Sequence, residues 1–207
     1  MKKKDLLDDL SSIKNIMERS TKFISLSGLS GVMAGVYALV GAGYAFTVLQ
    51  SGKAAGPGHT YRDEVIVPLV FTAIAVLILS VSTGIWLTIR KARRKGLTVW
   101  NPVSKALLLS GGIPLATGGL VIIILLLQRH FAIISAGCLI FYGLALVSAS
   151  HHTFGDVKWL GIFEVIIGLA ALAIPGYGFL LWVLGFGVMH ILYGAIMHFK
   201  YDREVNA

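Results

Sequence analysis

Six long apolar runs, separated by short links, dominate the chain. They cover residues 23–49, 65–90, 103–127, 131–150, 157–175 and 178–198. Each run is near the length of about 20 mostly apolar residues that a helix needs to cross a hydrocarbon core of roughly 30 Å. In lipid, only a helix or a closed barrel pairs every backbone polar group, and these runs are continuous rather than alternating. The predicted fold class is therefore all-α, a polytopic membrane protein with six transmembrane helices.

The links between the runs predict three antiparallel helical hairpins. The hairpins cover residues 23–90, 103–150 and 157–198. Residues 128–130 and the Pro175-Gly176 pair form the shortest links, and short links make consecutive helices antiparallel neighbours. Residues 1–22 are predicted to form a cytoplasmic amphipathic helix, and residues 199–207 a cytoplasmic tail.

Positive charge is unevenly distributed over the links. The net charge is +8, but only 14% of the residues are charged, against about 25% in a soluble domain. With a cytoplasmic N-terminus, every Lys and Arg except Lys53, Arg62 and Arg129 lies on the cytoplasmic side, as the positive-inside rule requires. The charge thus predicts that both ends are cytoplasmic, and it is assigned to orientation in the bilayer rather than to binding of nucleic acid.

Glycines recur at equivalent positions in the runs. Pairs of glycines seven residues apart occur in the odd-numbered spans, at Gly28 and Gly35, Gly111 and Gly118, and Gly161 and Gly168. The even-numbered spans share a glycine near the predicted cytoplasmic end, at Gly84, Gly143 and Gly194. These positions predict three copies of one hairpin; the alternative is chance, because glycine is common in membrane helices.

The third hairpin has a cadence of Gly, apolar residues, a second Gly, a Pro-Gly turn and a late Gly over residues 158–198. In this it resembles the repeat of the HdeD-like acid-resistance membrane proteins. That resemblance implies a six-span bundle of hairpins in a bacterial inner membrane, with a stress-related role. The stretch at residues 16–35 resembles a family of small inner-membrane proteins of Bacteroidota. Neither resemblance assigns a role to a residue, and Glu164 departs from the repeat, which has Gly31 and Pro114 at the aligned positions.

Glu164 is an acidic residue inside the fifth apolar run. Ionisable side chains in a membrane are costly, and they usually face the interior of the bundle and a partner. Glu164 is eight residues from Asp156, and His190 is eight residues from His198, so both lie roughly 12 Å from the same side. Tyr142 falls at a similar depth, and Tyr193 lies one turn nearer the cytoplasm. These four residues predict a layer for proton relay or substrate binding; the alternative is a pair that only holds two helices together.

A second group of polar residues gathers at the predicted cytoplasmic ends of the spans. His151, His152, Asp156 and His198 are of the types that bind Zn²⁺ or a similar ion. Their spacing matches no established metal motif, so ordinary interfacial histidines are the alternative. No other cofactor is predicted.

Two features point to protein partners besides the lipid bilayer. Within residues 1–20, Leu6, Leu10, Ile13 and Met17 recur at helical spacing, which suits the inner leaflet, a second copy of the helix or a cytoplasmic protein. Gly31 and Gly35 have the small-residue spacing at which membrane helices approach closely, either inside the bundle or in a homo-oligomer.

Three functions follow from these features. The first is a small transporter, channel or proton-coupled protein that uses the Glu164–His190 layer. The second is a non-catalytic scaffold or stress sensor that binds a cytoplasmic partner through residues 1–20. The third is a metal-dependent membrane enzyme at the histidine cluster, although the sequence contains no phosphate loop, nucleophile elbow or pair of catalytic carboxylates.

Overall fold

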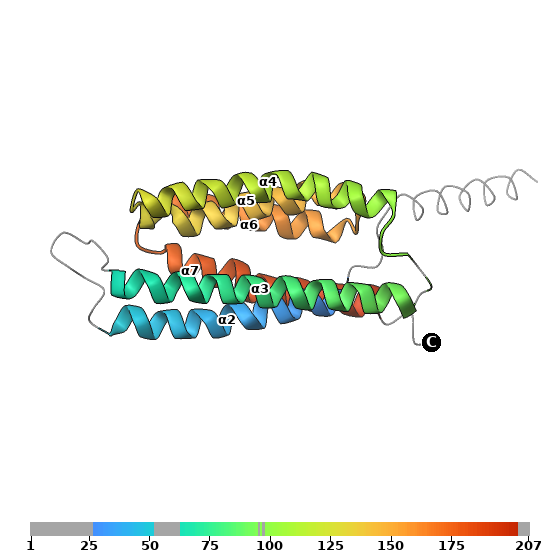
Figure 1. Ribbon diagram of the computed structural model, residues 1–207, viewed down its shortest axis with the longest axis horizontal. Helices are drawn as coiled ribbons and strands as arrows, with labels where there is room; N and C mark the ends of the chain where they lie inside the picture. Colours follow the sequence, from blue (N-terminus) through green and yellow to red (C-terminus); the bar gives the residue numbers. More distant parts are fainter. Residues whose placement is uncertain (1–26, 52–62, 95, 97, 203–207) are drawn as a thin grey trace, which may run out of the picture.

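The computed structural model describes residues 27–51, 63–94, 96 and 98–202 of the chain (Figure 1). These residues are almost all helical and include no strand, which confirms the predicted all-α class. The amphipathic helix predicted within residues 1–22 lies outside the described residues, as do residues 52–62 and 203–207.

The helices follow the six predicted spans closely. They are α2 (Gly28–Gln50), α3 (Asp63–Arg94), α4 (Pro102–Leu127), α5 (Ile134–Ala149), α6 (Asp156–Ala173) and a sixth helix made of four consecutive parts. Short 3-10 turns, Phe131–Ile133 and Ser150–His152, extend α5 at both ends. The sixth helix consists of α7 (Gly178–Trp182), a π-helical segment (Val183–Met189), α8 (His190–Met197) and a final π-helical turn (His198–Asp202). Residues 199–202, which were predicted to belong to the tail, therefore continue the last helix.

Five of these helices are long and apolar enough to cross a membrane. They are Gly28–Gln50, Asp63–Arg94, Pro102–Leu127, Phe131–His152 and Gly178–Tyr201. Helix α6 has 18 residues but includes Asp156, Lys158 and Glu164, and it packs against α5 and the sixth helix. Large apolar side chains cover the outside of the bundle; Phe71, for example, is 69% exposed and Leu127 is 80% exposed. Such a surface suits lipid tails rather than water, so the chain is a multi-pass membrane protein.

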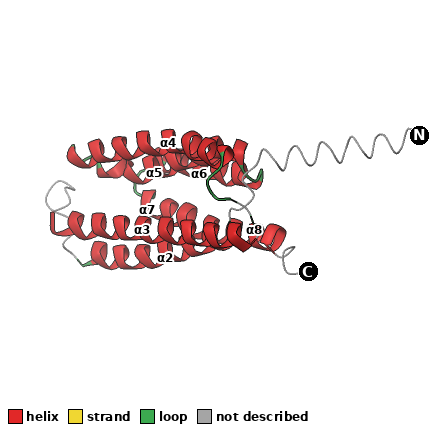
Figure 2. Cartoon of the chain, turned by 45° about the vertical axis from the view of Figure 1, so that its right-hand side comes forward, coloured by secondary structure: helices red, strands yellow, loops and turns green. Residues whose placement is uncertain are grey.

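The helices form two layers, which both views of the chain show (Figures 1 and 2). The first layer contains α2, α3 and the sixth helix, and the second contains α4, α5 and α6. The chain passes from α6 to the sixth helix through a tight turn, in which Gly176 has a φ of +92°, a conformation that favours glycine. The sixth helix packs against both α5 and α6, so it forms the main contact between the layers.

Close glycine contacts hold the helices together within each layer. In the first layer, a Cβ at Gly31 would lie 3.1 Å from Cα of Gly194, and one at Gly35 would lie 2.6 Å from the Gly187 carbonyl oxygen. In the second layer, Gly143 and Gly161 face each other, and a Cβ on either would lie 2.6 Å from the other's carbonyl oxygen. The sixth helix thus occupies the face of Gly31 and Gly35. This supports the interpretation of these small residues as packing inside the bundle, and a homo-oligomer stays a prediction.

Helix α4 begins where the sequence provides a strong start signal. The Asn101 side chain accepts a hydrogen bond from the backbone N–H of Ser104 at 2.8 Å, and the Ser104 hydroxyl accepts one from the backbone N–H of Asn101 at 2.9 Å. Pro102 occupies the first helical position, where its missing N–H costs nothing. This start lies at the same end of the molecule as the ends of α3 and of the sixth helix and the start of α6 (Figure 1). Of the described Lys and Arg residues only Arg129 lies elsewhere, so we call this end the basic end.

Candidate functional site

Glu164 is completely enclosed between the two layers. Its side chain lies on α6, has 0% exposure and is among the largest fully buried side chains of the described residues. Neither of its carboxyl oxygens has a hydrogen-bond partner among the described residues. An acid that is buried without donors is costly, so its nearest polar neighbour determines which charge states are accessible.

That neighbour is His190, at the start of α8. The Nδ1 atom of His190 lies 3.3 Å from Oε1 of Glu164, and the imidazole is also buried. Nδ1 also lies 3.0 Å from the carbonyl oxygen of Gly185, one turn earlier in the sixth helix. The structure therefore brings together Glu164 and His190, which the sequence analysis had placed at the same depth in the membrane. It adds the backbone carbonyl of Gly185 as a third polar group at this site.

Tyr142 of α5 completes the cluster from the second layer. Its hydroxyl lies 2.8 Å from Nε2 of His190. The Tyr142 ring also packs against Phe186, with 5.0 Å between the ring centroids, and Phe186 in turn packs against Trp182 at 5.1 Å. We call Glu164, His190 and Tyr142 the buried triad. It joins α6 and α5 to the sixth helix.

The sixth helix departs from α-helical geometry next to the triad. Residues Val183–Met189 form a π-helical segment. Such segments are rare in proteins, and those that occur are often found at functional sites. A Cβ on Gly185 within this segment would lie 2.5 Å from Oε2 of Glu164 and 2.5 Å from a methyl group of Leu139. A Cβ at this position would force the Glu164 carboxyl group and the Leu139 methyl group to shift, so Gly185 provides both a carbonyl acceptor and the space that Glu164 fills.

The buried triad has partners for more than one arrangement of its protons. With a proton on Nδ1, His190 donates to the Gly185 carbonyl and Nε2 accepts from the Tyr142 hydroxyl. With the proton on Nε2 instead, the ring donates to the phenol oxygen of Tyr142, and Nδ1 faces a protonated Glu164 as an acceptor. A doubly protonated ring faces the Glu164 carboxylate with Nδ1–H. The same heavy-atom positions therefore suit three protonation states of His190, and the last two, as described, leave the Glu164–His190 pair with no net charge.

Tyr193, which was predicted to belong to this layer, does not join the triad. Its ring packs against Phe163 of α6 at 6.3 Å, and among the described residues no hydrogen bond links it to Glu164, His190 or Tyr142. Tyr193 is three residues beyond His190, so it lies about one turn nearer the basic end, as predicted, and there its ring contacts α6 rather than the triad.

The predicted metal cluster is not assembled either. Among the described residues, no group of three or more His, Cys, Asp and Glu side chains could hold a metal ion. Nδ1 of His151 lies 3.1 Å from the carbonyl oxygen of Ser148 in the preceding turn, and His152 closes the short helical turn that follows α5. The backbone of His198 packs against Gly28 in the first layer. Asp156 is engaged by other residues, so the four predicted ligands do not converge.

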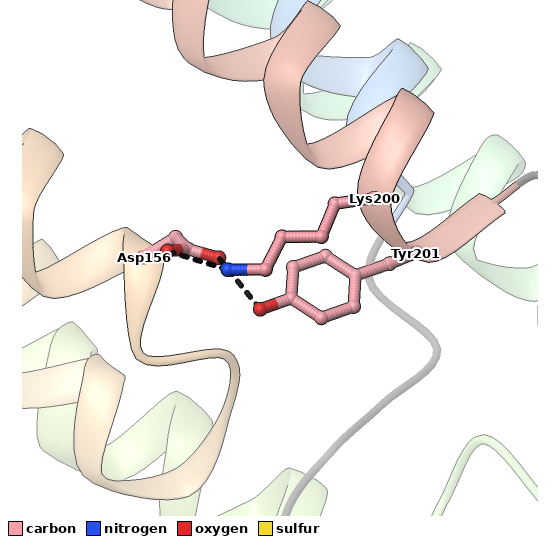
Figure 3. Close-up of polar contacts among 3 residues, drawn as sticks. All are labelled: Asp156, Lys200 and Tyr201. Atoms are coloured by element: carbon pink, nitrogen blue, oxygen red, sulfur yellow. Dashed lines mark hydrogen bonds and ion pairs between the residues drawn. The ribbon is translucent and has the colours of Figure 1, made fainter.

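Asp156 instead joins the layers at the basic end, through two residues of the last helical turn (Figure 3). Its carboxylate accepts hydrogen bonds from Nζ of Lys200 at 2.9 Å and from the hydroxyl of Tyr201 at 2.6 Å. Partial burial raises the pKa of Asp156, but the hydrogen bonds from Tyr201 and Lys200 and the charge of Lys200 outweigh this and hold that pKa below its ordinary value. We call these three residues the surface triad.

Sequence reasoning missed the surface triad and the role of Gly185. Lys200 and Tyr201 fall in residues that were predicted to form a tail, so no helix face was assigned to them. Gly185 and Gly187 interrupt the apolar pattern as a Gly-Phe-Gly sequence, which was the only signal for the irregular segment.

Comparisons of the chain with protein-family models, with curated proteins and with solved structures find no match in any of the three. The resemblance of residues 158–198 to the HdeD-like repeat therefore stays a prediction. The functional argument depends on the geometry of the buried triad.

Proposed function

We propose that the protein is a small proton-coupled transporter or channel, in which Glu164 takes up and releases a proton through His190 and Tyr142. The observation that supports this most is the enclosed Glu164 carboxyl group, which has no hydrogen-bond donor within the described part of the chain and lies 3.3 Å from an imidazole nitrogen. Intramembrane acids of this kind are typical of proton and ion pathways.

A proton is the ligand that this site suits best. Metal cations such as Ca²⁺ and Mg²⁺ need six or more oxygen ligands, whereas Glu164 is closed in by Leu139 and Gly185. A proton needs no extra space, and the imidazole offers one nitrogen towards the acid and the other towards Tyr142. An imidazole with two such contacts can accept a proton on one side and release one on the other.

A purely structural role explains the triad less well. A buried ion pair contributes little stability compared with apolar residues of similar size, because the cost of removing its charges from water offsets their attraction. The buried triad also lies at the contact between the two layers, where a change of charge would alter how they pack. Both features favour a site that changes its protonation during function over one that only joins helices.

The topology that we propose has six crossings with both ends in the cytoplasm of a bacterial cell. All described Lys and Arg residues except Arg129 lie at the basic end, which supports a cytoplasmic location for that end. Glu164 is two helical turns from Asp156, so the proton site is nearer the cytoplasmic face than the opposite face.

The test is proton flux through the purified protein in liposomes that contain a pH-sensitive dye, with the membrane potential clamped. An acid pulse should acidify vesicles that contain the native protein. The substitution Glu164→Gln, which keeps the shape but cannot ionise, should reduce the rate about tenfold or more, because it removes the ionisable group. Asp156→Asn on the same helix is the matched control and should leave the rate unchanged.

Equal rates for the native protein and Glu164→Gln would contradict the proposal and favour the structural interpretation. So would a loss of flux in both variants, because the effect would then be general to acidic residues of α6.

A further inference from the structure

A dense group of basic residues lies outside the buried triad, at the basic end of α3 and the start of α4. Its described members are Arg90, Lys91, Arg93, Arg94 and Lys105, which we call the α3–α4 basic patch. No Asp or Glu occurs between residues 65 and 155, so no acidic residue of this long stretch neutralises the patch. The local positive charge is therefore strong.

One face of α3 presents much of this charge. Trp86, Arg90 and Arg93 are spaced four and three residues apart, which places them on the same side of the helix. All three are exposed, whereas Leu87 and Ala92 on the other side are buried. The guanidinium of Arg90 lies over the Trp86 ring, 5.4 Å from its centroid. This face therefore combines an indole and guanidinium groups at the end of a long apolar helix.

The same combination recurs at the start of α4. Nζ of Lys105 lies 5.6 Å from the centroid of the exposed Trp100 ring. Tryptophan is enriched where hydrocarbon meets headgroups, because its ring is apolar and its N–H is polar. Two pairs of tryptophan and cation at the same end of the bundle indicate that this end lies at the level of the lipid headgroups.

The three arginines of the patch differ from two other cations of the described residues, which are neutralised by acids. Arg129 pairs with Asp63 at 2.8 Å, and Lys200 pairs with Asp156 at 2.9 Å. By contrast, Arg90, Arg93 and Arg94 form no ion pair with any residue that the structure describes. A guanidinium group binds phosphate oxygens through two parallel hydrogen bonds, and at the headgroup level phosphates are the abundant anions.

We propose that the α3 part of the patch, formed by Arg90, Arg93 and Arg94 beside Trp86, is a binding site for the phosphate headgroup of an anionic phospholipid. The acyl chains would lie along the apolar surface of α3 next to this face, where Ile78, Leu79 and Ile85 are at least half exposed. This inference needs only that the bundle lies in a membrane, and it does not depend on the proton-coupled function.

The test uses tryptophan quenching by brominated lipids in a chain whose only tryptophan is Trp86, with Trp100, Trp159 and Trp182 replaced by Phe. The protein is placed in nanodiscs with either brominated phosphatidylglycerol, which is anionic, or brominated phosphatidylcholine, which is zwitterionic. We expect Trp86 to prefer the anionic lipid by at least about fivefold, because each cation near a membrane surface adds to the attraction. A second chain that retains only Trp159 should show no preference.

Two sets of substitutions separate a site from general attraction. Replacing Arg90, Arg93 and Arg94 with Gln should abolish the preference at Trp86. Replacing the same three with Lys keeps their positive charge, so the protein should still insert in the same orientation. It removes the guanidinium groups that can form two parallel hydrogen bonds to a phosphate. We expect the Lys variant to lose more than half of the preference. Equal quenching by both lipids in the parent chain, or a full preference in the Lys variant, would overturn the proposal.

Discussion

Two triads with similar chemistry join α6 to the sixth helix, and their surroundings differ completely. The surface triad combines Asp156 with a lysine and a tyrosine, and the buried triad combines Glu164 with a histidine and a tyrosine. The carboxylate of Asp156 accepts hydrogen bonds from both of its partners, and Lys200 remains half exposed. The carboxyl group of Glu164 is fully buried and accepts no hydrogen bond from the residues that the structure describes.

The difference teaches how to separate a functional acid from a structural one. A surface ion pair contributes about 0–1 kcal/mol, and water can replace either partner at little cost. A buried acid next to one base is costly to maintain, and it depends on that base for its charge state. The surface triad is therefore expected to tolerate substitution, and the buried triad is expected to respond strongly.

The largest expected effect on stability comes from removing the base of the buried triad. His190→Ala leaves Glu164 buried without a partner, which should destabilise the protein by about 3–5 kcal/mol at neutral pH. Lys200→Ala, the equivalent change in the surface triad, should cost about 1 kcal/mol or less. Thermal unfolding of both variants in the same detergent measures the difference.

A double variant identifies the cause. Glu164→Met combined with His190→Ala removes the unpaired acid and should recover most of the lost stability. If His190→Ala is no less stable than Lys200→Ala, the buried triad is no more sensitive to loss of its base than the surface triad, which would contradict the comparison.

The next effect concerns the space that Glu164 fills. Gly185→Ala places a methyl group 2.5 Å from Oε2 of Glu164 and from Leu139, and overpacking of this kind costs about 1–3 kcal/mol. A Cβ on Gly112 of α4 would meet nothing within 4 Å, so Gly112→Ala is the matched control and should be neutral or slightly stabilising. Equal unfolding temperatures for the two alanine variants would show that Glu164 does not pack against Gly185.

A smaller effect is expected from the tyrosines. Tyr142→Phe removes the hydroxyl that lies 2.8 Å from His190 and should cost about 1 kcal/mol, because the imidazole nitrogen loses its partner in a buried site. Tyr201→Phe removes the hydroxyl next to Asp156, where water can take its place, and should cost less. The order of the two unfolding temperatures tests this, and the reverse order would contradict it.

The smallest effect is the pH dependence of the surface triad. The folded protein holds the pKa of Asp156 below its ordinary value, so the ionised form stabilises the fold above that value, and the stabilisation is lost as pH falls through the folded pKa. Asp156→Asn should remove this acid-dependent component, which is worth less than about 1 kcal/mol. Unfolding curves of the two proteins should converge in strong acid; a constant difference at all pH values would contradict the assignment.

Much of the fold was predictable from the sequence. The continuous apolar runs identified the six helices to within a few residues, except at the first helix, which the structure describes from Gly28, and at the last, which continues to Asp202. The division into two layers was not predictable, because helices that face lipid on one side and apolar neighbours on the other lack a clear polar face to orient them.

The site shows the same limit at the level of single residues. Counting residues from the predicted cytoplasmic ends of the spans placed Glu164, His190 and Tyr142 at one depth, and these three make contact. The same count placed Tyr193 one turn nearer the cytoplasm but could not identify its neighbours, and its ring packs against Phe163 instead of the triad. The π-helical segment at Val183–Met189 shifts the helical register, which no pattern with a period of 3.6 residues reveals.

The most direct test of the central claim is infrared difference spectroscopy of the protein in lipid during a pH titration. A protonated carboxyl group in a dry site has a carbonyl stretch that is separate from that of an ionised carboxylate. We expect a reversible band of this kind in the native protein and in Asp156→Asn, and no such band in Glu164→Gln. A native spectrum without a pH-dependent carboxyl band, or a band that persists in Glu164→Gln, would contradict the claim that Glu164 binds and releases a proton.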